Sequence, residues 1–209
     1  MIRVVVADDH AVVRAGLIRI IRDREEMEVS GEASSVDELL TMVRDVRFDV
    51  LLLDVNLHGK TSLEAMKTIR ASHPGISILV LSMYPEEQYA IRFIKAGAAG
   101  YLTKDTAPEQ LVEAIERIAA GGHFITPQLA EMAVFGVHGP DSVAHETLSD
   151  REYEVMLGIA NGKRIRELAS ELDLSEKTVS TYRSRILRKL GCASNAEIVQ
   201  YALSHNLLS

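Results

Sequence analysis

The chain has 209 residues, of which 47% are apolar, and a formal net charge of −7 at neutral pH. This length suits one large domain or two small ones with proper cores. The longest apolar runs fall far short of a membrane span, and a strand-like run begins at Arg3, so we expect neither a transmembrane helix nor a signal peptide. A single cysteine, Cys192, excludes an internal disulfide. The composition predicts a soluble, cytoplasmic protein.

The negative charge is unevenly distributed along the chain. From His145 to the C-terminus there are nine acidic and nine basic residues, so the whole deficit lies in the first two-thirds. Within the neutral part, the segment from Lys177 to Lys189 carries five basic residues and no acidic one. Because a local basic stripe matters more than net charge for phosphate contact, nucleic-acid binding by the C-terminal part is not excluded.

Strand-like and helix-like segments alternate through the first 122 residues. The predicted strands are Arg3–Ala7, Met27–Ala33, Asp49–Asp54, Ser77–Ser82 and Gly100–Thr103. The predicted helices are His10–Arg22, Ser35–Val46, Leu63–Ser72, Glu86–Ala96 and Pro108–Ala120. The core strands are apolar throughout, which is typical of strands covered by helices on both faces. The pattern predicts an α/β fold with a doubly wound, five-stranded parallel sheet, whose ligands bind beyond the carboxyl ends of the strands.

The periodic pattern fades after this unit and then changes type. A short helix at Gln128–Phe135 is expected before a linker that extends to His145. Four helical patterns and no convincing strand follow. They span approximately Asp150–Asn161, Ile165–Leu172, Glu176–Leu190 and Asn195–His205. We therefore predict three parts: an α/β domain over residues 1–122, a linker over 123–146 and an all-α four-helix domain over 147–209.

Polar side chains stand where the predicted strands end. Asp8 and Asp9 follow the first strand, Asp54 ends the third, Ser82 ends the fourth and Lys104 follows the fifth. The carboxyl ends of neighbouring parallel strands meet at one edge of the sheet, so these side chains are expected to converge. Each aspartate taken alone is more typical of a helix N-cap or a turn, but five such polar residues at successive strand ends favour a site.

Three carboxylates at one edge repel each other unless a cation lies among them, and a hard divalent ion such as Mg²⁺ fits that setting. Asp9 and Asp54 are the predicted side-chain ligands, Asp8 acts through water, and the carbonyl of Asn56 completes the set. A neutralised pocket of this kind lets a carboxylate attack phosphorus. We expect Asp54 to be the phosphoryl acceptor.

The C-terminal helices carry a second signal. Ser149 and Glu152 form a capping box, and Ser175 caps the third helix after a tight turn, so two helices joined by a short turn predict a helix-turn-helix. The outward face of the third helix carries Lys177, Thr178, Ser180, Thr181, Tyr182, Ser184, Arg185 and Arg188. Basic and hydroxyl side chains hold phosphate oxygens, and short polar ones can reach base edges. The alternative, basic residues that only complement the helix dipole, leaves the hydroxyls unexplained.

The set Asp8–Asp9, Asp54, Ser82 and Lys104 resembles the receiver domain of bacterial two-component response regulators, which has a flavodoxin-like fold. The resemblance covers residues 1–122, and Ala96–Asp105 is especially similar to the NarL/FixJ group. It implies that a sensor histidine kinase donates phosphate to Asp54, that Lys104 and Ser82 contact the phosphoryl group, and that Tyr101 is an aromatic switch. The alternative reading of Tyr101 is an ordinary core aromatic, and both readings can hold at once.

Residues 147–208 resemble the LuxR-type DNA-binding domain of the same group. The resemblance implies that Lys177, Thr178, Tyr182, Arg185 and Arg188 bind the DNA backbone and that Ser180, Thr181 and Ser184 face the bases. The partner would be double-stranded promoter DNA. The last helix carries Ile198, Ala202 and Leu203 near one face, with Tyr201 beside them. It is either the contact of a homodimer formed on phosphorylation or a packing face within the domain.

The loop after Asp54 departs from the family pattern. His58 stands where the family usually has Pro, and Ser62 where it usually has Gly. Losing Pro frees a fixed φ, and losing Gly penalises any conformation with positive φ. We expect a differently shaped loop, with an effect on kinase choice or on the lifetime of the acyl phosphate.

The main hypothesis is a phosphorylation-controlled transcription factor that catalyses only its own phosphotransfer and dephosphorylation. A phosphatase with an aspartate nucleophile is a second reading, but such enzymes usually carry an acid two residues later, where this chain has Asn56. A third is a DNA-binding protein with a vestigial, unphosphorylated receiver, which the complete set of five residues disfavours.

Overall fold

The computed structural model describes residues 1–57, 61–83, 86–127, 129–130, 144–205 and 207–208. The chain forms two compact units, Met1–Val134 and Phe135–Ser209. The expected short helix at Gln128–Phe135 and the linker after it lie almost wholly outside the described residues. In the part of the chain that the structure describes, the helices are too short or too polar to cross a lipid bilayer.

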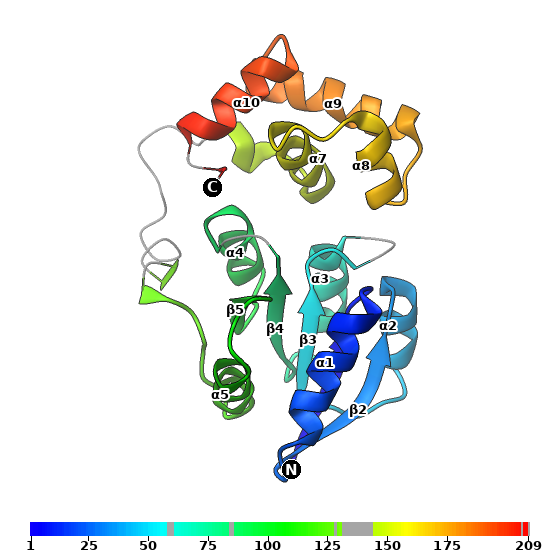
Figure 1. The fold of residues 1–209 in the computed structure, drawn as a ribbon, viewed down its shortest axis with the longest axis vertical. Helices are drawn as coiled ribbons and strands as arrows, with labels where there is room; N and C mark the ends of the chain where they lie inside the picture. Colours follow the sequence, from blue (N-terminus) through cyan, green and yellow to red (C-terminus); the bar gives the residue numbers. More distant parts are fainter. Residues whose placement is uncertain (58–60, 84–85, 128, 131–143, 206, 209) are drawn as a thin grey trace. The chain divides into compact units, whose positions relative to one another are not determined.

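The N-terminal unit is built on five parallel strands (Figure 1). They are β1 (Ile2–Ala7), β2 (Met27–Ala33), β3 (Val50–Asp54), β4 (Ser77–Ser82) and β5 (Gly100–Thr103). Their order in the sheet is β2-β1-β3-β4-β5, so the order reverses beside β1 and β3. This is the doubly wound sheet that the alternating pattern predicted, and its switch point lies between the strands that carry Asp8, Asp9 and Asp54.

Helices cover both faces of this sheet. They are α1 (Ala11–Arg22), α2 (Val36–Met42), α3 (Ser62–Ser72), α4 (Glu86–Lys95) and α5 (Pro108–Ala119). Val4, Val50 and Leu79 belong to one core cluster with residues of α1 and α5. Their neighbours along the strands, such as Val5 and Leu51, are also fully buried and point to the opposite face, because side chains alternate along a strand. Burial on both faces explains the unbroken apolar runs.

Local signals set where these helices begin. Ser35 accepts a hydrogen bond from the Glu38 backbone N–H and Thr61 accepts one from Glu64, so hydroxyl caps start α2 and α3. α2 ends at Met42, four residues before the predicted end, while the other predicted boundaries agree within one residue.

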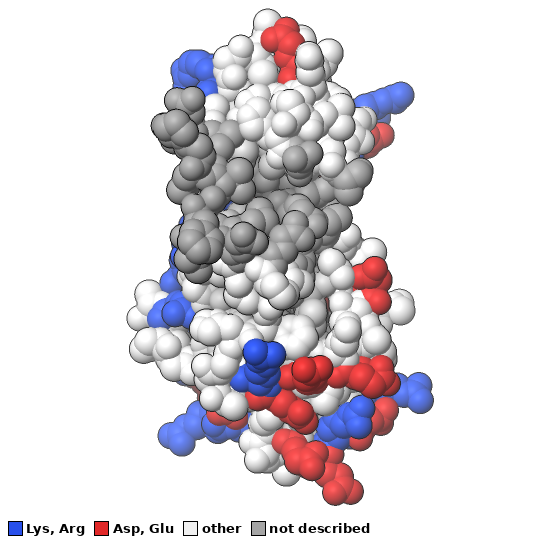
Figure 2. Space-filling view, turned by 90° about the vertical axis from the view of Figure 1, so that its left-hand side faces the viewer, with Lys and Arg blue, Asp and Glu red and all other residues white. Residues whose placement is uncertain are grey.

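On the side of this unit shown in Figure 2, acidic side chains gather in one area with basic ones among them.

The C-terminal unit contains a short 3-10 turn and four described helices. They are η1 (Ala144–Thr147), α7 (Asp150–Ala160), α8 (Ile165–Glu171), α9 (Glu176–Leu190) and α10 (Asn195–Ser204). The predicted capping box of Ser149 and Glu152 is present at the start of α7. α7 and α8 approach closely at Gly158, where a Cβ would lie 2.2 Å from the Leu168 Cδ2 atom. A larger residue at this position would require the buried Leu168 side chain to move.

Candidate functional site

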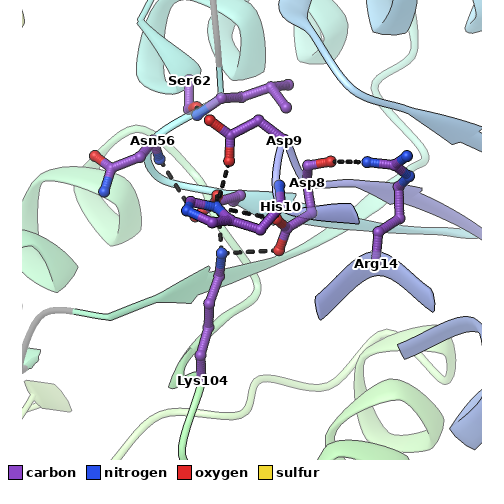
Figure 3. A network of polar contacts seen from close by, with 9 residues as sticks. Asp8, Asp9, His10, Arg14, Asn56, Ser62 and Lys104 are labelled. Carbon is purple, nitrogen blue, oxygen red and sulfur yellow. Dashed lines mark hydrogen bonds and ion pairs between the residues drawn. The ribbon is translucent and has the colours of Figure 1, made fainter. Parts of the chain in front are cut away.

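Asp54 lies at the carboxyl edge of the sheet. It is the last residue of β3, its Cα pairs with that of Leu81 in β4, and it is 1% exposed. Asp8, directly after the neighbouring β1, is also 1% exposed, and the side chain of Asp9 is 8% exposed. The sheet therefore brings the three predicted carboxylates together, and Figure 3 shows Asp8 and Asp9 within the polar network around them.

Lys104 enters the same pocket from the loop after β5. Its Nζ lies 2.8 Å from Asp8 Oδ2 and 2.8 Å from Asp54 Oδ2, and its side chain is 4% exposed. Burial raises the pKa of the Asp54 carboxyl to about 6, and the positive charge of Lys104 only partly offsets this effect. Burial opposes the charge of Lys104, but its contacts with Asp54 and Asp8 outweigh burial and raise its pKa. The pocket thus holds a positive charge beside the predicted acceptor.

Two side chains that the sequence did not assign to the site also reach it. The His10 Nδ1 atom lies 2.5 Å from Asp9 Oδ1. The Arg14 guanidinium donates from Nη1 to the carbonyl oxygen of Asp8 at 2.7 Å and from Nε to Glu32 at 3.1 Å. The only signals for them were the position of His10 directly after the carboxylate pair and that of Arg14 four residues later, one helical turn along.

The donor atoms in the pocket suit a metal ion. Asp8, Asp9, His10 and Asp54 each offer one ligand atom, and these atoms all lie within 4.8 Å of one another. The backbone N–H of Asn56 donates to Asp54 Oδ1 at 3.3 Å, so the loop residue predicted to supply a carbonyl ligand lies against the acceptor. Carboxylate and carbonyl oxygens are the ligands that hard divalent cations prefer.

Ser82 lies at the carboxyl edge of the sheet, and Tyr101 lies two residues before the end of the neighbouring β5. Ser82 ends β4 with 0% exposure, and its carbonyl oxygen accepts the backbone N–H of Lys104 at 2.7 Å. Tyr101 is the largest of the fully buried side chains, with 0% exposure. Its burial fits the interpretation as a core aromatic, and the switch role stays a prediction.

The predicted helix-turn-helix consists of α8 and α9. The turn between them places Asp173 at φ 52°, and Ser175 accepts the Thr178 N–H at 3.1 Å to start α9. Val179 and Ile186 are fully buried and fix one face of α9 against the unit. The predicted DNA-contacting residues are exposed or half-buried on the rest of the helix: Lys177, Thr178, Ser180, Thr181, Tyr182, Ser184, Arg185 and Arg188.

Hydroxyls and cations on this face behave differently. Thr181 donates to the Lys177 carbonyl at 2.9 Å and Ser184 to the Ser180 carbonyl at 3.0 Å, so these hydroxyls lie along the helix surface. Within the described residues, Lys177 and Arg185 make no ion pair, and the same holds for Arg188. By contrast, Arg183 and Lys189 contact other side chains of the unit. Lys177, Arg185 and Arg188, which make no ion pair among the described residues, are therefore basic residues that the sequence assigned to phosphate contact.

Comparison with known proteins decides the family. The profile of the response regulator receiver domain matches residues 4–116, and that of the luxR family of bacterial regulatory proteins matches residues 146–202. The chain is a two-component response regulator of the NarL/FixJ group. Residues 4–116 are thus its receiver domain, and residues 146–202 its LuxR-type DNA-binding domain. Its function is transcription regulation under the control of phosphorylation.

The regulator resembles known proteins over nearly its whole length. It is 37% identical to the response regulator GacA of Pseudomonas aeruginosa, over 100% of this chain and 98% of the relative. It is 35% identical to UvrY of Escherichia coli K12, over 99% and 96% of the two chains. Among solved structures, RcsB of Salmonella enterica serovar Typhimurium, bound to the rprA promoter with the phosphomimetic BeF3−, matches with 25% identity and a TM-score of 0.66 over 96% and 97%.

The atypical loop of this receiver domain is only partly described. His58 lies outside the described residues, and the prediction about it stays a prediction. Ser62 is the first residue of α3, and Asp173 is the one described non-glycine residue with positive φ, so the backbone penalty considered for Ser62 does not arise. Instead, the buried Ser62 hydroxyl accepts the backbone N–H of Leu57 at 3.4 Å across the loop. A glycine could not make this contact.

The last helix of the LuxR-type domain divides its apolar residues between two roles. Ile198 and Ala202 are fully buried, so they pack within the domain. Leu203 is 58% exposed, and the Tyr201 hydroxyl lies 3.2 Å from the backbone nitrogen of His145, which donates to it. The buried residues of α10 fit packing within the domain, and the exposed Leu203 fits a dimer contact.

Proposed function

We propose that Asp54 accepts a phosphoryl group from a sensor histidine kinase, with Mg²⁺ held by Asp9, Asp54, the Asn56 carbonyl and, through water, Asp8. The observation that carries this proposal is the burial of Asp54 between a second carboxylate and the Lys104 ammonium, 2.8 Å from its Oδ2 atom. A structural aspartate at a strand end needs no such partners. The chemistry of the donor set, three carboxylates beside a carbonyl, fits the ion.

The residues of the pocket would divide the work. A carboxylate oxygen of Asp54 attacks phosphorus, the bond between phosphorus and the donor breaks, and an acyl phosphate forms on the carboxylate. When bound, Mg²⁺ supplies positive charge to the phosphoryl oxygens. Lys104 offers a second cation to the same oxygens, and the Ser82 hydroxyl a hydrogen-bond donor. In this proposal the protein catalyses only its own phosphorylation and dephosphorylation.

The phosphoryl group would then control DNA binding. A contact of the phosphoryl group with Ser82 shifts a two-state receiver domain in which Tyr101 takes part, and the shift alters pairing of two regulators on promoter DNA. Lys177, Arg185 and Arg188 would hold the DNA backbone. The structure of RcsB on promoter DNA with a phosphomimetic supports this order of events by similarity.

Phosphorylation of the purified full-length protein tests the assignment of Asp54. With acetyl phosphate and Mg²⁺, we expect one phosphoryl group per chain for the wild type and none for Asp54→Asn. Asp49→Asn is a matched control, since this aspartate pairs with Arg3 at 2.7 Å, and it should label like the wild type. Labelling of Asp54→Asn at the wild-type level would overturn the proposal.

The DNA contacts predict a steep dependence of affinity on salt, because each neutralised phosphate releases counterions. Arg185→Ala is expected to weaken promoter binding and to reduce the slope of log affinity against log salt concentration by about 1. Arg19→Ala removes an exposed arginine from α1 of the receiver domain and should leave the slope unchanged. Fluorescence anisotropy over a salt series measures both. An equal slope for Arg185→Ala and the wild type would contradict the backbone contact.

A further inference from the structure

The imidazole of His10 stands at the mouth of the carboxylate pocket. Its Nδ1 atom lies 2.5 Å from Asp9 Oδ1, 3.6 Å from Asp8 Oδ1 and 4.0 Å from Asp54 Oδ2. Figure 3 shows the ring beside Asp8 and Asp9. Its side chain is 62% exposed, whereas those of the three aspartates are 8% exposed or less. One ring nitrogen thus faces all three carboxylates from the solvent side.

The backbone holds the ring in this direction. His10 is the N-cap residue of α1 but makes no side-chain capping bond. Its backbone N–H donates to Asp8 Oδ1 at 2.8 Å, and its carbonyl accepts the Arg14 N–H at 2.9 Å. The Arg14 side chain in turn donates to the Asp8 carbonyl and to Glu32. The imidazole is therefore left available for the pocket while its main chain is fixed.

The distances suit a shared ion. Ligand atoms about 2.1 Å from one metal lie about 3 Å apart when adjacent and about 4 Å apart when opposite. The separations of His10 Nδ1 from Asp8 and Asp54, 3.6 and 4.0 Å, lie in this range, and the 2.5 Å contact with Asp9 needs a small opening. Lys104 contacts Asp8 through Oδ2, so Asp8 Oδ1 faces the ring, whereas Asp54 presents to the ring the same Oδ2 atom that Lys104 contacts. A histidine that only neutralised Asp9 would not need to face three carboxylates.

We propose that His10 is a nitrogen ligand of this pocket and lets it bind divalent transition ions that favour imidazole, such as Ni²⁺, in addition to Mg²⁺. The inference rests on the proposed function in one respect, that the carboxylates hold a divalent cation. Imidazole nitrogen suits Ni²⁺ and Zn²⁺, whereas Mg²⁺ takes oxygen ligands. The carboxylates alone serve both kinds of ion, so the nitrogen determines how strongly the pocket discriminates between them.

Calorimetric titration of the full-length protein with Ni²⁺ and with Mg²⁺ tests the proposal, counting only the Ni²⁺ binding that is lost when Asp9 is replaced by Asn. His10→Asn is expected to lower Ni²⁺ affinity roughly 10-fold or more and to leave Mg²⁺ affinity within about twofold. His123→Asn is the matched control. This exposed histidine precedes Phe124, whose backbone pairs with Gly100 in β5, the outer strand that β4 separates from the pocket strands β1 and β3. It should change neither affinity.

The possible outcomes separate this proposal from the previous one. A selective loss of Ni²⁺ affinity in His10→Asn supports the nitrogen ligand. Equal losses for both ions would show that the ring only positions the carboxylates, and no loss for either would show that it is a bystander; both results overturn the proposal. If the wild type binds Ni²⁺ but no Mg²⁺, the Mg²⁺ assignment in the proposed function fails, while a loss of all Ni²⁺ binding in His10→Asn still supports the ligand.

Discussion

Asp54→Asn is expected to raise the free energy of unfolding of the metal-free protein by about 3 kcal/mol at pH 7. Burial raises the pKa of this carboxyl from 3.8 to about 6, with Lys104 acting in the opposite direction and the charge of Asp8 in the same one. The folded protein keeps the proton up to about pH 6, whereas the unfolded chain releases it near pH 3.8. The contribution to stability is therefore complete below pH 3.8 and is lost as the pH rises through 6.

Urea unfolding in the presence of a chelator, over a series of pH values, measures this effect as the difference between wild type and variant. The difference should grow between about pH 4 and pH 7, because Asn cannot ionise. Asp49→Asn is the control of opposite sign, since the hydrogen bond from Arg3 lowers the pKa of that carboxyl. Adding Mg²⁺ should stabilise the wild type more than Asp54→Asn. A metal-free variant that is less stable than the wild type at pH 7 would refute the prediction.

Lys189→Met is expected to destabilise the LuxR-type domain by about 2–3 kcal/mol. The variant should therefore lose DNA binding at a lower temperature than the wild type. Glu152 is 3% exposed, and its Oε2 atom accepts from Lys189 at 2.5 Å and from the Ser149 backbone N–H at 2.8 Å. Removing the ammonium leaves a buried carboxylate with one backbone donor. The expected value lies below the roughly 3–5 kcal/mol typical of a broken buried pair, because the Lys189 side chain is 33% exposed.

Two further variants separate charge from packing. Adding Glu152→Gln to Lys189→Met should restore part of the loss, because a neutral amide needs no counter-ion. Lys163→Met breaks the more exposed pair with Glu171 and should cost no more than about 1 kcal/mol. Burial raises the pKa of Glu152, but the contacts with Lys189 and Ser149 outweigh burial and lower it. The stability that this carboxylate contributes should therefore be lost as the pH falls. Denaturation followed by circular dichroism gives these values, and equal losses for Lys189→Met and Lys163→Met would contradict the argument.

The sequence was enough to predict the elements and the convergence of the acidic pocket. Apolar runs such as Val50–Leu53 identify strands buried on both faces, and parallel topology places their carboxyl ends together. Caps such as Ser149 and Ser175 are local, so their positions are also readable from the chain. The predicted spans of both the sheet strands and the helix-turn-helix are confirmed.

Features that depend on side-chain direction were not predictable in this way. Glu152 was recognised as a capping residue, but its pairing with Lys189 joins residues 37 positions apart. His10 was counted as the start of a helix, since its spacing says nothing about where the ring points. The reach of Arg14 back to the Asp8 carbonyl likewise depends on its rotamer.

The contact between Ser62 and the Leu57 N–H has a consequence for the metal ligands proposed above. That N–H belongs to the same peptide plane as the Asn56 carbonyl, and in a trans peptide the two groups point in opposite directions. By accepting the N–H inside the loop, the serine hydroxyl fixes the direction in which the carbonyl oxygen points, away from Ser62. A residue eight positions after the acceptor thereby sets the rotation of one peptide group, which a glycine at the same position would leave to the loop alone.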